Sequence, residues 1–233
     1  MDSGFTLKSP KLMRKNTKSD DNIKVQGSDL EEVEHFKYLG SYISANSNIE
    51  KEISTRIGLA AHAFSGLRNI WKSTILQTST KLKIYKSNVR SVLLYASETW
   101  RTNKKIESRL RGFEGRCLRR ILKLHWQQHV TNEEVSRRTG INNIVAEVRQ
   151  RRWRWLGHVL RMPKSRYPLT ALRWVPPGKR KRGRPLGTWR RTVEEEMRKA
   201  GKTWSELGWL AQDRDGWRKF VGAFCSSQWN QEK

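Results

Sequence analysis

The stretch RQRRWRWLGHVLRMPKSRYPLTALRWVPPGKRKRGRPLGTWRR, residues 149–191, carries fifteen Lys or Arg residues and no Asp or Glu. It also holds four of the chain's eleven tryptophans and five of its six prolines. Fifteen like charges repel one another, and a polyanion screens them well because it releases its own condensed counterions. Interleaved tryptophans add flat surfaces on which bases stack. The stretch therefore predicts a nucleic-acid interface; the alternative is a solvated basic surface whose tryptophans turn inward.

The rest of the chain shares this charge bias. The 233 residues include 48 Lys or Arg against 22 Asp or Glu, which gives a net charge of +26 and favours a nucleic-acid partner. Neither a long apolar run nor a lipidation signal is present, so no membrane partner is expected. The length allows one large domain or two small ones.

Cysteine use and the termini bear on the compartment. Cys117 and Cys225 lie far apart and form no disulfide framework, which fits a reducing compartment. The first twenty residues hold no apolar signal core. Lys179–Arg182 (KRKR) resembles a nuclear import address. We expect a protein of the nucleus or the cytoplasm.

Apolar residues recur every three or four positions from residue 49 onward, which predicts helices. Three amphipathic helices are expected over residues 49–71, 82–100 and 106–124. Together they would bury one core as a bundle with a Lys- and Arg-rich exterior.

Further helices follow in the C-terminal half. Thr131 with Glu134, and Thr203 with Glu206, have the spacing of capping boxes, which begin helices. Periodicity predicts further helices over residues 143–161, 188–200 and 213–224. Prolines and glycines between Pro163 and Gly187 predict an extended basic segment.

The first 48 residues have the pattern of short strands, not of helices. Ile23–Val25 and Phe36–Ile43 suit short strands, with a bend at Gly40. The predicted fold is thus mainly α. It consists of a small N-terminal β-hairpin, a three-helix bundle, and a basic helical C-terminal domain with an extended Pro/Gly/Arg-rich segment.

Candidate catalytic and metal-binding groups are few. Asp20 and Asp21, the adjacent aspartate pair, sit among polar residues and predict a solvated turn, although polymerases and nucleases use such carboxylates to hold metal. Cys117, His125 and His129 lack a fourth ligand for a tetrahedral metal site, and Cys117 lies on an apolar helix stripe. No nucleophile triad or phosphate-binding loop motif is present. We expect no catalytic residue, metal, cofactor or small-molecule substrate for this chain.

Several segments resemble a known family. FKYLGSYIS (residues 36–44), EISTRIGLAAHAFSGLRNIWKS (52–73) and STKLKIYKSNVRSVLLYASETWRT (79–102) resemble the region after the catalytic centre of non-LTR (LINE-type) retrotransposon reverse transcriptases. Four later segments resemble the C-terminal region of the same polyproteins, in the same order: IESRLRGFEGRCLRRIL, RQRRWRWLGHVLRMP, GKRKRGRPLGTWRRTVEEEMRKAGKTW and AQDRDGWRKFVGAFC.

The resemblance implies a domain plan. Residues 1–48 would be a palm remnant, with Tyr38, Leu39 and Gly40 in a primer-grip hairpin. Residues 49–125 would be the thumb, and residues 126–233 a basic, Trp-rich nucleic-acid-binding domain. The family's aromatic-x-Asp-Asp turn would lie before residue 1, so we expect a fragment of an RNA-directed DNA polymerase that is not an enzyme alone. Mg²⁺ is expected only in the full-length family polymerase.

The same reasoning predicts contacts with a template RNA and with primer or target DNA. Thumb cations would follow the duplex, and the basic stretch would hold single-stranded or structured RNA, with Trp153 or Trp155 available for stacking. Residues 182–185 (RGRP) would either enter a minor groove or contact phosphates. The predicted contacts are Lys81, Lys86, Arg90, Arg151, Arg152, Trp153, Arg154, Trp155, Arg161, Lys179, Arg180, Lys181, Arg182, Arg184, Arg190 and Arg191.

Three other interpretations remain open. One is an active enzyme whose catalytic residues the sequence does not reveal. A stand-alone helical DNA-binding regulator would read bases from a recognition helix, and residues 131–161 have the length of a helix-turn-helix. A relic of a decayed gene would have no function at all.

Overall fold

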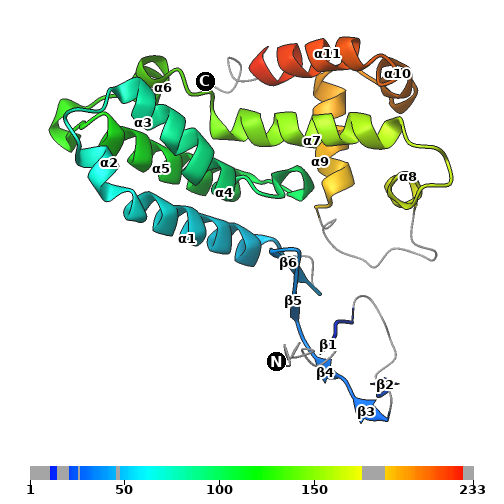
Figure 1. Ribbon diagram of the computed structural model, residues 1–233. Coiled ribbons are helices and arrows are strands. Elements are labelled where there is room, and N and C mark those ends of the chain that lie inside the picture. The colour runs from blue at the N-terminus through cyan, green and yellow to red at the C-terminus, as the bar shows by residue number, and fades with distance from the viewer. Residues whose placement is uncertain (1–10, 15–20, 26, 46–47, 175–186, 228–233) are drawn as a thin grey trace, which may run out of the picture. The chain divides into compact units, whose positions relative to one another are not determined.

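The computed structural model describes residues 11–14, 21–25, 27–45, 48–174 and 187–227, and the described part is mainly helical, as predicted (Figure 1). The chain forms two compact units, Met1–Thr55 and Arg56–Lys233. Apart from the first residues of the helix that begins at Glu50, the helices predicted for the thumb and for the C-terminal domain lie in the second of these units. The division into three domains at residues 48 and 125 stays a prediction.

The first unit contains short paired strands. Parallel strands β1 (Lys11–Leu12) and β4 (Glu31–Glu32) pair with each other, and β2 (Lys24–Val25) pairs with antiparallel β3 (Ser28–Asp29). The longest pair is the antiparallel hairpin of β5 (His35–Tyr38) and β6 (Ser41–Ser44).

The β5–β6 hairpin turns through two residues with positive φ. Leu39 has φ 46° and Gly40 has φ 81°, the left-handed pair that a tight two-residue hairpin turn requires. The backbone N–H of Tyr42 donates to Glu52 Oε2 at 2.7 Å, which ties β6 to the first turn of the following helix. The predicted hairpin and the bend at Gly40 are confirmed.

The remaining elements are helices, and α1 continues from the first unit into the second. They are α1 (Glu50–Gly66), α2 (Arg68–Lys72), α3 (Thr78–Ile84), the π-helix η1 (Tyr85–Arg90), α4 (Ser91–Leu93), the 3₁₀ turn η2 (Ser97–Thr99), α5 (Lys104–Ile121), the 3₁₀ turn η3 (Trp126–Gln128), α6 (Asn132–Thr139), α7 (Ile144–Leu160), α8 (Tyr167–Arg173), α9 (Trp189–Lys199), α10 (Trp204–Leu210) and α11 (Arg214–Ser227).

At the predicted starts of α6 and α10, a side chain caps the first turn of the helix. Thr131 Oγ1 accepts from the N–H of Glu134 at 3.2 Å and begins α6, which ends where Gly140 takes φ 59°. Thr203 and Glu206 form a complete capping box at the start of α10, with each side chain bonded to the other residue's N–H. These local signals are strong because the partners are three residues apart.

Two predicted segments differ from the structure. One continuous helix is predicted over residues 82–100. In the structure, the helical stretch includes the π-helix η1 and ends at Leu93, and the chain reverses at Ala96, whose φ is 57°. The segment predicted as extended from Pro163 to Gly187 contains the helix α8, with Pro168 in its first turn, where the missing N–H costs nothing. Within the same segment, residues 175–186 lie outside the described residues.

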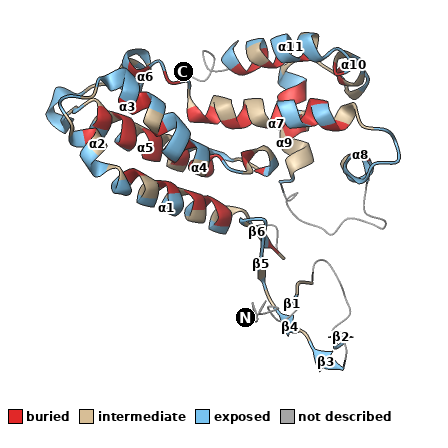
Figure 2. Ribbon diagram, viewed as in Figure 1, coloured by how far each residue is buried: buried red, intermediate tan, exposed pale blue. Residues whose placement is uncertain are grey.

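Helix α7 is the centre of the second unit. It packs against α5, η2, α8, α10 and α11, and Figure 1 shows α11 running beside it and α9 crossing it. Buried residues lie along its length (Figure 2). Trp153 and Leu156, both fully buried, form one core cluster with buried residues of α9, α10 and α11: Val193, Met197, Leu207, Ala211, Trp217, Val221, Phe224 and Cys225.

A second aromatic cluster joins α1, α2 and η1. The rings of Phe64 and Trp71 stack with centroids 4.9 Å apart, and Tyr85 meets Phe64 edge-on at 6.4 Å. Trp71 Nε1 donates to the Phe64 carbonyl at 2.7 Å, so its one polar atom is satisfied inside the core.

Gly157 lets α11 approach α7 closely. A Cβ at Gly157 would overlap the indole of Trp217, whose Nε1 donates to the Trp153 carbonyl at 3.1 Å. Gly222, on α11, has no atom within 4 Å of an added Cβ.

We expect Gly157→Ala to lower the free energy of unfolding by about 1–3 kcal/mol, because the methyl group overpacks the α7–α11 contact. Gly222→Ala, the control, should leave it unchanged or raise it by up to about 1 kcal/mol, since alanine favours a helix. Urea unfolding followed by circular dichroism measures both. Equal stability of the two variants would contradict the close packing.

Candidate nucleic-acid interface

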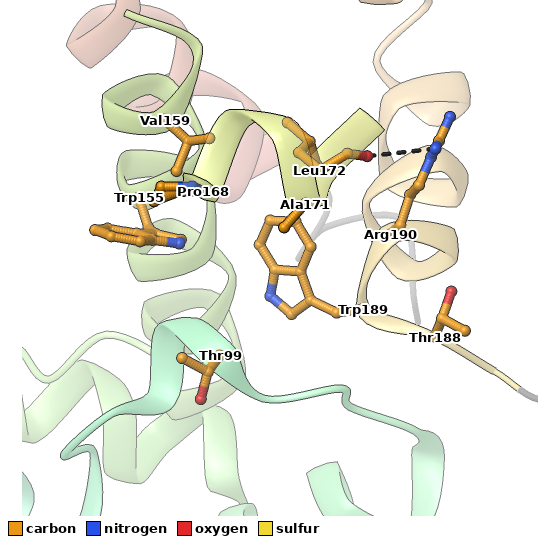
Figure 3. A pocket seen from close by; sticks show the side chains of 9 residues that line it. All are labelled: Thr99, Trp155, Val159, Pro168, Ala171, Leu172, Thr188, Trp189 and Arg190. Atoms are coloured by element: carbon orange, nitrogen blue, oxygen red, sulfur yellow. Dashed lines mark hydrogen bonds between the residues drawn. The ribbon is translucent and has the colours of Figure 1, made fainter. Parts of the chain in front are cut away.

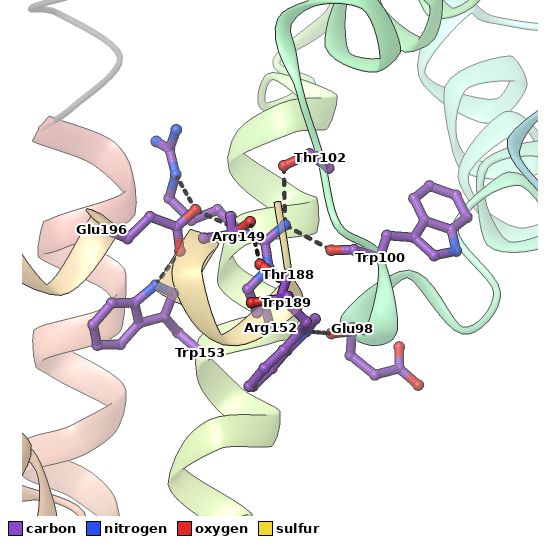
Figure 4. Close-up of polar contacts among 10 residues, drawn as sticks. Glu98, Trp100, Thr102, Arg149, Arg152, Trp153, Thr188, Trp189 and Glu196 are labelled. Carbon is purple, nitrogen blue, oxygen red and sulfur yellow. Dashed lines mark hydrogen bonds and ion pairs between the residues drawn. The ribbon is translucent and has the colours of Figure 1, made fainter. Parts of the chain in front are cut away.

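Two arginines at the start of the basic stretch, Arg149 and Arg152, point into the protein (Figure 4). One carboxylate oxygen of Glu196, on α9, accepts from Arg152 Nη1 at 2.5 Å and from Arg149 Nε at 3.4 Å. The other oxygen accepts from Trp153 Nε1 at 2.7 Å. Arg152 is only 1% exposed, so α7 presents three donors to one buried acid.

This cluster contains one more positive charge than negative. Burial lowers the pKa of Arg152, Arg149 lowers it further, and Glu196 opposes both effects. Arg152 Nη2 donates to the Trp100 carbonyl and to Thr102 Oγ1, each at 3.0 Å. A buried cation is tolerated only when its remaining donors are bonded, and these bonds meet most of that need.

Side chains of α7 and α9 also hold the segment of residues 94–102. Arg151 Nη1 donates to the Leu94 carbonyl at 3.0 Å, and Trp189 Nε1 donates to the Glu98 carbonyl at 2.8 Å. With the bond from Arg152 to Trp100, three long side chains fix this irregular backbone. The backbone carbonyls of this segment thus bind side chains of α7 and α9. A continuous α-helix would use these carbonyls for its own hydrogen bonds.

Four of the predicted nucleic-acid contacts are therefore corrected. Arg152 and Trp153 belong to the Glu196 cluster. Lys81 is 3% exposed, and its Nζ donates to the carbonyls of Trp71 and Ser73. Each of these side chains is surrounded by protein and bonded to it, so none is available to a phosphate or a base.

Arg90 is the fourth buried residue of this group. Its Nε lies 2.9 Å from Glu114 Oε1, and its Nη2 donates to the Asn142 carbonyl at 2.6 Å. Burial raises the pKa of Glu114 to about 7, although Arg90 acts to lower it. Arg90 thus links η1 to α5 and to the start of α7.

The other predicted contacts divide by exposure. Lys86, Arg154 and Trp155 are exposed. Arg151, Arg161, Arg190 and Arg191 are half-buried; Arg161 donates to the Ala211 carbonyl and Arg190 pairs with Glu194. Lys179, Arg180, Lys181, Arg182 and Arg184 lie outside the described residues. In the first unit, Tyr38, Leu39 and Gly40 are exposed at the hairpin tip.

One basic surface was missed as a candidate site. Lys105, Arg109, Arg116 and Arg120 follow at intervals of four, seven and four residues, which places them on one face of α5. We call this set the α5 cationic face. Lys105, Arg116 and Arg120 are exposed and Arg109 is half-buried, while Glu114 lies on the opposite, buried side. The spacing of these residues is visible in the sequence, but by itself it predicts only a Lys- and Arg-rich exterior.

The α5 cationic face is long and open at its centre. It extends about 22 Å from Lys105 to Arg120 at the rise of an α-helix. Gly112 lies on the same exposed face between Arg109 and Arg116. Because glycine has no side chain, nothing projects from the face at this position. Glu107 projects elsewhere, so no acid of α5 interrupts the face. Such a surface can follow a row of phosphates.

Metal-binding clusters and membrane-spanning helices were the other features considered in the sequence, and the described residues form neither. Among the described residues, no three His, Cys, Asp or Glu side chains come together to hold a metal ion. No helix in the described ranges is long and apolar enough to cross a membrane. Cys117 is buried in its helix core, as predicted; burial raises the pKa of both Cys117 and Cys225 to about 12.

Comparisons with known proteins point to mobile elements. Residues 63–95, from α1 to just beyond α4, match a family described as a domain of unknown function (DUF6451). Over 196 residues the chain is 29% identical to an uncharacterized transposon-derived protein of Caenorhabditis elegans. The match covers 81% of this chain and 70% of that protein. No solved structure matches the chain significantly.

We expect Glu196→Gln to lower the free energy of unfolding by on the order of 3 kcal/mol, because two buried guanidinium groups lose their counter-charge. Glu195→Gln removes a charge from the neighbouring exposed position and should change stability by less than about 0.5 kcal/mol. Urea unfolding of the three proteins tests this. If E196Q is as stable as E195Q, the cluster does not hold α7 to α9.

Glu114 predicts a pH dependence. Its pKa rises from 4.5 to about 7 on folding, so the protonated acid favours the folded state. The stability present at low pH is then lost as the pH rises through about 7. Relative to Glu114→Gln, the wild type should lose on the order of 2 kcal/mol of unfolding free energy between about pH 5 and pH 8. Urea unfolding of both proteins at several pH values measures this, and parallel pH curves would contradict it.

Proposed function

We propose that the chain binds nucleic acid through its phosphate backbone, with the α5 cationic face as the main described contact. The observation that carries the proposal is the exposed pair Arg116 and Arg120, one helical turn apart on a face to which α5 contributes no acid. The net charge of +26 supports it, because counterion release from the nucleic acid would drive binding.

The proposal extends to the origin of the chain. It is the thumb and C-terminal part of a non-LTR retrotransposon reverse transcriptase, in line with the sequence resemblance. The similarity to a transposon-derived protein over most of the chain supports a transposon origin. In this proposal the partners are template RNA and primer or target DNA, in the nucleus or the cytoplasm.

The proposed role is to bind and position, without catalysis. The chain alone needs no cofactor, and Mg²⁺ belongs to the full-length polymerase of the family. Because phosphate contacts carry little sequence information, binding should depend on salt more than on sequence.

The structure disfavours the helix-turn-helix alternative. In that alternative α7 would be the recognition helix, with its side chains in a major groove. Instead, α7 is packed against α5, α8, α10 and α11, and Arg149, Arg152 and Trp153 are bonded inside the protein.

We expect the double variant Arg116→Ala/Arg120→Ala to bind a 20-base-pair duplex more weakly and with a smaller salt dependence. The slope of log K against log salt should fall in magnitude by about 1.8, since each lost phosphate contact contributes about 0.9. Titrations by fluorescence anisotropy at four or more salt concentrations measure the slope.

Arg137→Ala/Arg138→Ala provides the matched control, because these exposed arginines already pair with Glu134 at 2.7 and 2.6 Å. Its slope should stay near that of the wild type. The proposal fails if the wild type binds neither duplex nor single strand at low salt. An unchanged slope in the Arg116/Arg120 variant would remove the α5 cationic face from it.

A further inference from the structure

A pocket of about 420 Å³ lies between α7, α8, α9 and the η2 turn (Figure 3). Two indoles, Trp155 from α7 and Trp189 from α9, contribute flat apolar surfaces to its walls. The other lining residues are mostly apolar or small: Thr99, Val159, Pro168, Ala171, Leu172, Thr188 and Arg190. This size and lining are typical of small-ligand sites.

The walls of the pocket are fixed by hydrogen bonds. Trp189 Nε1 donates to the Glu98 carbonyl at 2.8 Å, which fixes that indole. Arg190 donates to the Leu172 carbonyl at 3.3 Å and to Glu194 at 2.8 Å, which joins α9 to the end of α8. Trp155 stays 38% exposed. The Trp189 wall is therefore preformed, and a flat ring can stack on it without first ordering that indole.

One of the chain segments that line the pocket is strongly basic. Residues 151–174, which contribute Trp155, Val159, Pro168, Ala171 and Leu172 to the lining, contain seven Lys or Arg residues and no Asp or Glu. Of these, Arg154, Lys164, Arg166 and Arg173 are exposed. A ligand that combines an apolar flat ring with a nearby negative charge fits both the pocket and its rim.

We infer that this pocket binds an unpaired nucleobase of a single strand, with its phosphates on the cationic rim. The inference rests on the proposed nucleic-acid binding and gives it a site for bases. An apolar side chain of a protein partner would fill the pocket too, but it would leave the rim without counter-charge. A nucleotide has both groups: its base would fill the pocket, and its phosphates would pair with the cations of the rim.

Two aromatic residues next to the pocket support a single strand as the ligand. Tyr167 begins α8 and is 87% exposed, and Trp174 follows α8 and is 63% exposed. Exposed aromatic side chains beside cations are the usual surface for successive stacked bases.

The test compares a single-stranded dA12 oligonucleotide with a 12-mer of the same phosphate count whose sugars are abasic. Because phosphate contacts are equal, the ratio of the two affinities isolates base binding. For the wild-type chain we expect dA12 to bind at least about fivefold more tightly, as stacking of one base provides. An rA12 arm shows whether the pocket prefers RNA.

Two variants locate the effect. Trp155→Ala removes one wall, and Ala171→Trp fills the pocket; both should bring the affinity ratio close to one while the salt slope stays unchanged. Trp209→Ala, which removes an 82% exposed indole outside the pocket, is the control and should keep the wild-type ratio. Circular dichroism confirms that each variant is folded.

The possible failures are distinct. Equal wild-type affinity for dA12 and the abasic 12-mer overturns the base pocket and leaves the phosphate binding in place; the pocket would then suit an apolar segment of a protein. A ratio that survives in both W155A and A171W places base recognition elsewhere and also overturns the inference. Failure of both oligomers to bind at low salt overturns the proposed function together with it.

Discussion

A single buried carboxylate, Glu196, accepts from two guanidinium groups and one indole of α7. It joins α7 to α9. Because two guanidinium groups face one carboxylate, the remaining N–H donors of Arg152 need neutral acceptors. Those acceptors are the Trp100 carbonyl and the Thr102 hydroxyl, so the same interaction also fixes the 94–102 segment. Without this carboxylate, two buried cations would repel each other in a core that excludes water.

This constraint divides the basic sequence into two groups with different roles. Residues on the inner side of α7 stabilise the second unit, while Arg154 and Trp155 on its outer side remain exposed. Net charge alone therefore overstates the binding surface, since several cations are neutralised inside the protein. Among the described residues, the surfaces that we propose for a polyanion are the α5 cationic face and the rim of the aromatic pocket.

The sequence predicted what depends on neighbours a few residues apart: the capped helix starts, the hairpin turn and the helical periods. It did not predict which tryptophan of Trp153 and Trp155 turns inward, because that depends on Glu196, more than forty residues away. The helix predicted over residues 82–100 was wrong for the same reason. The chain reverses at Ala96, and the neighbouring backbone is bonded by Arg151, more than fifty residues away. At Pro168 the residue type suggested extended structure, although proline also suits the first turn of a helix.

The most direct test of the account follows the tryptophan indole N–H signals by NMR, with hydrogen exchange, before and after a single-stranded oligonucleotide is added. We predict that the Trp153 indole N–H exchanges slowly and keeps its chemical shift, because it is bonded to Glu196 in the core. The Trp155 signal should move on binding. A Trp153 signal that exchanges fast and shifts with the oligonucleotide would contradict the account, since the basic stretch would then face its ligand with the residues that we place inside.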